Sequence, residues 1–226
     1  MQPYFFPGIS YFNLIHCCDT FVILDDYNFI KKGWINRNRF LENGNEKLIS
    51  VPLSKASQNK LISEVYTNDI KKFKIKFFKF ILNNYTERPI LRKLKDQTPS
   101  NEVSIAELNI IYLKLIIEHF NLKTVLIKSS NLDERTDNFR GQERIINICK
   151  QIGATTYINP IAGSKLYNAK QFSNNDITLK FLSPQYLEYR HTSEYFIPNL
   201  SILDLIFNVP TDQLFRYLAS YQLENA

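Results

Sequence analysis

The sequence lacks the segments that mark membrane and secreted proteins. No stretch approaches the ~18 consecutive apolar residues of a membrane helix, so no membrane span is expected. The opening MQPYFFPGISYF has two prolines and no basic region, so it does not fit a signal peptide. Its three cysteines are too few for a disulfide framework, which predicts free thiols and a cytoplasmic location.

Motifs of several common enzyme classes are also missing. The chain contains no GxxxxGK[ST], GxGxxG or GxSxG segment. Its histidines, His16, His119 and His191, do not have the spacing of a zinc site. We therefore predict no metal and no bound cofactor. His191, which follows Glu188-Tyr189-Arg190, is the one histidine considered as an acid or base.

The net charge of +6 arises in one quarter of the chain. Residues 51–100 hold eleven basic and four acidic side chains, and the remainder is close to neutral. A nucleic-acid binder, a protein with a phosphate-bearing substrate, or a single solvated basic helix would each give this pattern, and the last is the commonest. No helix-turn-helix or RNA-reading motif is present, so no nucleic-acid partner is predicted.

Composition and periodicity predict a globular α/β protein. The chain has 44% hydrophobic and 22% charged residues, with no repeat or Gly/Ser linker, which favours a single domain over residues 1–226. Asn43-Gly44 between residues 34–41 and 47–53 predicts an antiparallel hairpin. Further strands are expected at 20–25, 123–128, 154–158, 177–182 and 186–190, and helices at 70–81, 104–120, 140–152, 201–207 and 211–222. This alternation predicts a mostly parallel central sheet with flanking helices plus the hairpin.

Polar clusters follow three of the predicted strands. They are Asp25-Asp26, Ser129-Ser130 and Tyr157 to Asn159. In open α/β sheets ligands bind beyond the carboxyl ends of strands, so these clusters are expected to converge. A carboxylate there suits a general base, a metal ligand or an acceptor for sugar hydroxyls; a turn or a helix cap is the structural alternative.

Two groups of arginines suggest anion binding. If residues 36–39 are extended, Arg37 and Arg39 share one face, where two guanidinium groups suit a phosphate or carboxylate. The alternative is a solvated face paired with Glu42 or Glu46. Arg140 and Arg144 lie near the start of the predicted helix 140–152, whose free N–H groups favour an anion. The alternative is that Glu143 in the first turn complements the helix dipole.

Long segments of the chain resemble the WbqC-like family of bacterial proteins. These are MQPYFFPGISYFNLI, DTFVILDDYNFIKKGWINRNRFL, RGQERIINICKQIGATTYINPIAGSKLYN and FIPNLSILDLIFN, which together cover nearly the whole chain. Many members carry a short β-strand before the Gln-Pro step, whereas this chain starts at Met1, so one strand fewer is expected. The resemblance implies a role in the biosynthesis of O-antigen, and so lipopolysaccharide, or of another surface polysaccharide.

The reaction that the resemblance favours is acyl or aminoacyl transfer to the amino group of a nucleotide-linked amino sugar. The co-substrate would be a thioester-type donor, and an acyl carrier or other biosynthetic enzymes would be partners. The alternative is a non-catalytic protein that binds a sugar nucleotide or docks on a partner in the same pathway.

The expected catalytic residues are Asp25 or Asp26 as base, Asn159 as oxyanion donor, and His191. The expected substrate-binding residues are Gln2, Tyr4, Lys31, Asn36, Arg37, Arg39, Gln142, Arg144, Tyr157, Tyr167 and Asn199. Among these, Arg37, Arg39 and Arg144 would contact the phosphates.

Overall fold

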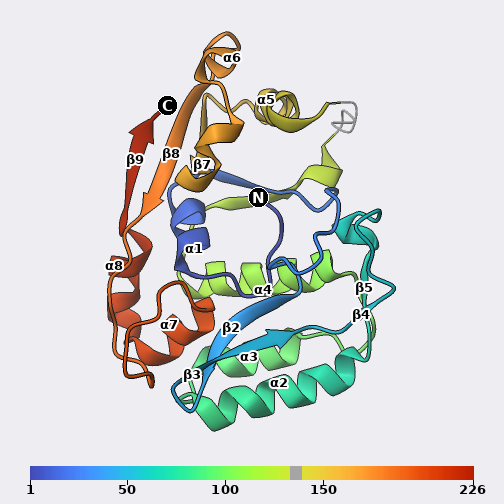
Figure 1. The fold of residues 1–226 in the computed structure, drawn as a ribbon, viewed down its shortest axis with the longest axis vertical. Coiled ribbons are helices and arrows are strands. Elements are labelled where there is room, and N and C mark those ends of the chain that lie inside the picture. The colour runs from blue at the N-terminus through green and yellow to red at the C-terminus, as the bar shows by residue number, and fades with distance from the viewer. Residues whose placement is uncertain (133–138) are drawn as a thin grey trace.

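The computed structural model describes residues 1–132 and 139–226, in which helices and short strands alternate (Figure 1). The strands are β1 (Thr20–Ile23), β2 (Arg37–Glu42), β3 (Asn45–Ser50), β4 (Leu53–Ser54), β5 (Tyr66–Thr67), β6 (Val125–Lys128), β7 (Thr156–Pro160), β8 (Thr178–Pro184) and β9 (Tyr221–Asn225). The α-helices are α1 (Ile9–His16), α2 (Ile70–Asn84), α3 (Pro89–Gln97), α4 (Ile105–His119), α5 (Gly141–Gln151), α6 (Ala169–Ser173), α7 (Ile202–Asn208) and α8 (Leu214–Leu218). The mixed α/β class is therefore confirmed.

The described strands form small separate sheets rather than one central sheet. β1 pairs with β6 and β7 with β8, both parallel, while β9 adds to β8 antiparallel. The prediction of one mostly parallel sheet is thus met only in these two pairs. Residues of both β1 and β7 line a cavity of about 480 Å³. On the side of β1 away from β6, Met1 bonds to Val22 and Leu24 through its main chain.

The hairpin is confirmed. β2 and β3 pair antiparallel with Glu42 opposite Asn45, and β4 and β5 form a second short antiparallel pair. Asn43 and Gly44 both have positive φ, 52° and 78°, which the tightest hairpin turn requires and which Asn and Gly tolerate best.

One predicted strand is wrong, and one predicted helix is wrong in part. The segment 186–190, predicted as a strand, has no regular structure. The predicted helix 211–222 is a 3₁₀ turn (Thr211–Gln213) followed by α8, and its end is instead β9. The free edge of β8 accepts residues 221–225 as a ladder, and this long-range pairing overrides the local helical pattern.

The basic segment forms a helix with one buried face. In α2 the buried side chains are Ile70, Phe73, Phe77, Phe78 and Ile81, whereas Lys71, Lys72, Lys76 and Lys79 are exposed. The 3.6-residue period of this stripe explains why a helix forms rather than a strand. Most of the local charge surplus therefore lies on a solvated helix face.

Buried apolar residues form two clusters. The larger packs α1, α2, α3, α4 and α7 around the β2–β3 hairpin, and the smaller lies between α5, α6 and β8. Figure 1 shows α5, α6 and the β7–β9 sheet at one end, α2 and α3 at the other, and α4 between them. Among the described helices, none has the length and apolar character needed to cross a bilayer.

Candidate functional site

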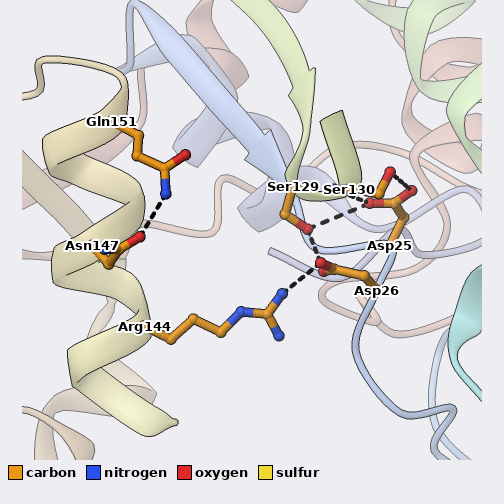
Figure 2. A network of polar contacts seen from close by, with 7 residues as sticks. All are labelled: Asp25, Asp26, Ser129, Ser130, Arg144, Asn147 and Gln151. Carbon is orange, nitrogen blue, oxygen red and sulfur yellow. Dashed lines mark hydrogen bonds and ion pairs between the residues drawn. The ribbon is translucent and has the colours of Figure 1, made fainter. Parts of the chain in front are cut away.

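Two strand ends meet in a network of carboxylates and hydroxyls (Figure 2). β1 and β6 run parallel with Ile23 opposite Lys128, so the residues that follow both strands lie together. Asp25 and Asp26 follow β1, and Ser129 and Ser130 begin the 3₁₀ turn after β6. The predicted convergence of these two clusters is confirmed.

Asp25 is the inner carboxylate. It is 3% exposed, and Ser130 donates to it from its backbone N–H (3.1 Å) and from its hydroxyl (2.7 Å). The Ser129 hydroxyl lies 3.4 Å from its Oδ1. A buried carboxylate with donors on both oxygens holds β1 and β6 together, and little of it is open to a ligand.

Asp26 is the outer carboxylate and pairs with an arginine from α5. Its Oδ2 lies 2.6 Å from Nη2 of Arg144, and its side chain keeps 21% exposure against 9% for Arg144. The Arg144 guanidinium also lies over the ring of Tyr27, 4.3 Å from its centroid. Ser129 has one hydroxyl proton for two carboxylates and stands closer to Asp26. Asp26 is therefore the carboxylate better placed to exchange a proton with a ligand.

Further along α5, Gln151 donates to Asn147 at 2.6 Å (Figure 2).

Three side chains gather around β7. The Tyr157 hydroxyl donates to Oδ1 of Asn159 at 3.1 Å and lies 3.3 Å from the Tyr167 hydroxyl. Burial raises the pKa of Tyr157 well above its usual range, so its phenol stays protonated. Asn159 donates to its own neighbour, the Pro160 carbonyl, at 3.1 Å. A Cβ on Gly163 would lie 2.2 Å from Nδ2 of Asn159, so a glycine is needed to leave room for this amide.

Tyr157, on β7, and Tyr167, after the following 3₁₀ turn, are electrostatically linked to Tyr27. Burial raises the pKa of Tyr27, the cation of Arg144 opposes that shift, and Tyr167 and Asp26 add to it. Tyr27 in turn contributes to the raised pKa of Tyr157. Tyr167 therefore affects the pKa of Tyr27, which follows Asp26, and the pKa of Tyr157, which bonds to Asn159.

Several predicted binding residues have partners within the chain. Asn36 donates to the Val51 carbonyl at 3.0 Å, and Nε of Arg37 donates to the Gly33 carbonyl at 3.1 Å. Gln142 accepts from the Asn168 backbone N–H at 2.9 Å and so links α5 to α6. Lys31 is exposed. The backbone carbonyl of Gln2 accepts from the Tyr11 hydroxyl at 2.9 Å.

Tyr4, Arg39 and Asn199 lie together, in a cavity whose lining includes none of the carboxylates. This cavity measures about 170 Å³ and is also lined by Trp34. Arg39 pairs with Glu46 at 3.0 Å, whereas Arg37 contacts loop carbonyls. The two guanidinium groups therefore do not converge on one anion within the chain.

His191 lines a third cavity, of about 410 Å³, with Tyr189 and Phe196 among its neighbours. Its ring nitrogens lie 3.2 Å and 3.1 Å from the backbone N–H groups of Ser193 and Ile197. A neutral imidazole accepts only one such bond, so the tautomer decides which of the two forms. This cavity shares no lining residue with the carboxylate network.

Sequence reasoning did not select Ser129, Ser130 and Tyr27 as site residues. The two serines form a polar cluster directly after a predicted strand, and this position is the sequence signal that indicates them. Tyr27 immediately follows Asp26, but nothing in the sequence places its ring beneath Arg144. Within residues 1–132 and 139–226, no three His, Cys, Asp or Glu side chains are grouped to hold a metal ion.

Together, the α/β fold and the meeting of polar strand ends define a candidate site at the edges of short parallel sheets. The model of the WbqC-like protein family matches residues 2–215, and the chain belongs to this family. Membership indicates a role in polysaccharide biosynthesis. The chain is also similar to the Mycobacterium tuberculosis protein named "Uncharacterized protein Rv1507c", with 27% identity over 92% of each chain. No solved structure matches it.

Proposed function

We propose that the protein transfers an acyl or aminoacyl group to the amino group of a nucleotide-linked amino sugar. The reaction takes place in the cytoplasm, during the biosynthesis of O-antigen or another surface polysaccharide. The donor is a thioester, free or on an acyl carrier. The sugar amine forms a C–N bond to the donor carbonyl, the C–S bond breaks, and the products are an amide and a thiol.

The observation that supports this proposal most is the partly exposed Asp26 carboxylate. Arg144 and Ser129 fix both of its oxygens, and its neighbour Asp25 is buried and occupied. Asp26 takes the proton that the sugar ammonium must lose before it can attack, which is the role of a general base.

Asn159 is the proposed oxyanion donor. Its Nδ2 carries two N–H groups, and one bonds to the Pro160 carbonyl. The second stabilises the negative charge that develops on the carbonyl oxygen of the donor. Tyr157 and Tyr167 hold the amide in orientation through the hydrogen bond to its Oδ1 and through each other.

A second function is favoured by how fully the site is paired internally. Asp25, Asp26 and Arg144 bond to groups of the chain itself, as structural residues do. A non-catalytic protein that binds a sugar nucleotide, or docks on a biosynthetic partner, would need no free base.

The test is to incubate the protein with UDP- and dTDP-linked amino sugars and acyl or aminoacyl thioesters. Mass spectrometry of the sugar nucleotide should show the gain of one acyl group, and Asp26→Asn should slow it. Binding of sugar nucleotides by calorimetry without any mass gain across the panel would favour the non-catalytic function.

A further inference from the structure

A cavity that borders Asn159 through its neighbour Pro160 combines one exposed aromatic face with a polar rim. It measures about 170 Å³, and the residues that the argument uses are Tyr4, Ser10, Trp34, Arg39 and Asn199. Trp34 is 43% exposed, although most aromatic side chains nearby are buried. Its backbone carbonyl accepts from Phe5 at 3.1 Å, which fixes the main chain and leaves the indole at the surface.

The polar rim is closely fitted. Asn199 adopts a left-handed φ of 55°, a conformation that Asn tolerates better than most residues, and its Oδ1 accepts from the Ser10 hydroxyl at 3.0 Å. A Cβ on Gly8 would lie 2.0 Å from that same oxygen, so the glycine leaves room for the Asn199 amide.

Arg39 bridges the rim and the aromatic face. Its guanidinium carbon lies 5.9 Å from the centroid of the Trp34 ring, and it pairs with Glu46 at 3.0 Å. Its Nε is buried and has no hydrogen-bond partner among the described residues. Because Glu46 already balances its charge, a ligand here gains little from a phosphate and more from neutral hydroxyl or amide groups.

We propose that this cavity binds the pyranose ring of the amino sugar, with Trp34 as the stacking face and specificity-determining residue. The inference rests on the proposed function and adds the place of the sugar. A pyranose has an apolar C–H face and a rim of hydroxyl groups, which match the indole and the Asn199–Ser10–Arg39 rim. Pockets for whole drug-sized ligands measure ~300–1,000 Å³, so this cavity fits one ring and not an entire nucleotide sugar. Pro160, next to Asn159, also lines it.

The chain contains one tryptophan, so its fluorescence reports on this cavity alone. We would titrate the full chain with UDP- and dTDP-linked amino sugars, with the free nucleotides, and with methyl glycosides of the same sugars. The nucleotide sugars and the glycosides should change Trp34 emission saturably, and the free nucleotides should not. An equal change with free nucleotide would mean that a base stacks on Trp34, and would overturn the proposal.

Calorimetry on variants gives an independent readout. Trp34→Leu should weaken binding of the methyl glycosides about tenfold, and Trp34→Tyr should restore most of it. Tyr66→Leu, which removes another exposed aromatic on β5, is the matched control and should bind as wild type. Sugar binding that leaves Trp34 emission and the Trp34→Leu affinity unchanged would overturn the proposal.

The two proposals fail in different ways. If glycosides bind on Trp34 but no acyl group is transferred, the sugar site is supported and the transferase is refuted. If acyl transfer occurs but Trp34 emission does not change, the transferase is supported and the sugar site is refuted. If no sugar ligand binds, both proposals are wrong.

Discussion

The contact between Asp26 and Arg144 gives the sharpest prediction about stability. The pair is only 2.6 Å apart, with 21% and 9% of the side chains exposed. Two unit charges ~4 Å apart interact by about 4 kcal/mol at an effective dielectric constant near 20. Since Asp26 remains partly exposed, solvent screening reduces this, and we expect a coupling energy of about 2 kcal/mol.

A double-mutant cycle with Asp26→Asn and Arg144→Met measures this coupling through urea unfolding. Each single variant removes the ion pair between the two residues, so the two losses should sum to more than the loss in the double variant. The matched control is Lys47–Glu42, 2.9 Å apart with 50% and 41% exposed side chains. The cycle of Lys47→Met and Glu42→Gln should give less than about 1 kcal/mol.

A coupling energy for Asp26 and Arg144 no larger than that of the control pair would refute the reasoning. It would mean that water screens the network as it screens the surface, and that Arg144 does not hold Asp26 in place.

Three further predictions concern groups outside the site. Changing Lys71, Lys72, Lys76 and Lys79 to Gln should lower the free energy of unfolding in urea by no more than about 0.5 kcal/mol each. Lys74→Gln should lower it more, because Lys74 donates to the Thr98 carbonyl at 2.7 Å. Equal losses would contradict the exposed lysine face. Thiol titration without reductant should find three thiols per denatured chain, and a count below three would contradict this. In the native chain Cys18 should react first, because its hydrogen bond with Cys17 lowers its pKa, whereas that bond raises the pKa of Cys17 and burial raises the pKa of Cys149 to about 11. Burial raises the pKa of Asp204 above its ordinary 3.8, so the folded state binds that proton more tightly, and wild-type unfolding free energy should fall relative to Asp204→Asn as pH rises from about 3 through the raised pKa. A difference that stays constant with pH would show that this carboxyl titrates alike in both states.

Local signals predicted the elements that depend on neighbouring residues. Asn43-Gly44 carries its own turn geometry, and the stripe of α2 needs only a 3.6-residue period. Ser104 accepts from the Glu107 backbone N–H at 3.1 Å, as its place before an apolar helix predicts. The meeting of Asp25 with Ser130 followed from one general rule about the ends of parallel strands.

Contacts that depend on the packing of distant elements could not be predicted. Arg144 lies 118 residues from Asp26 in sequence, and its pairing depends on where α5 packs. Residues 221 and 222 belong to the predicted helix 211–222, and only the edge of β8 shows that they begin a strand. Asn36 was considered for ligand binding, but its donation to the Val51 carbonyl depends on how the chain enters the hairpin.

The central claim is that Asp26 takes a proton during acyl transfer to an amino sugar. Its most direct test is the initial rate of acyl gain on a nucleotide-linked amino sugar by Asp26→Asn, under saturating donor, against wild type. The account predicts a fall of about 100-fold or more, the effect of losing a general base, while circular dichroism shows an intact fold. A rate within about threefold of wild type would contradict it, because general-base catalysis contributes ~100-fold at least.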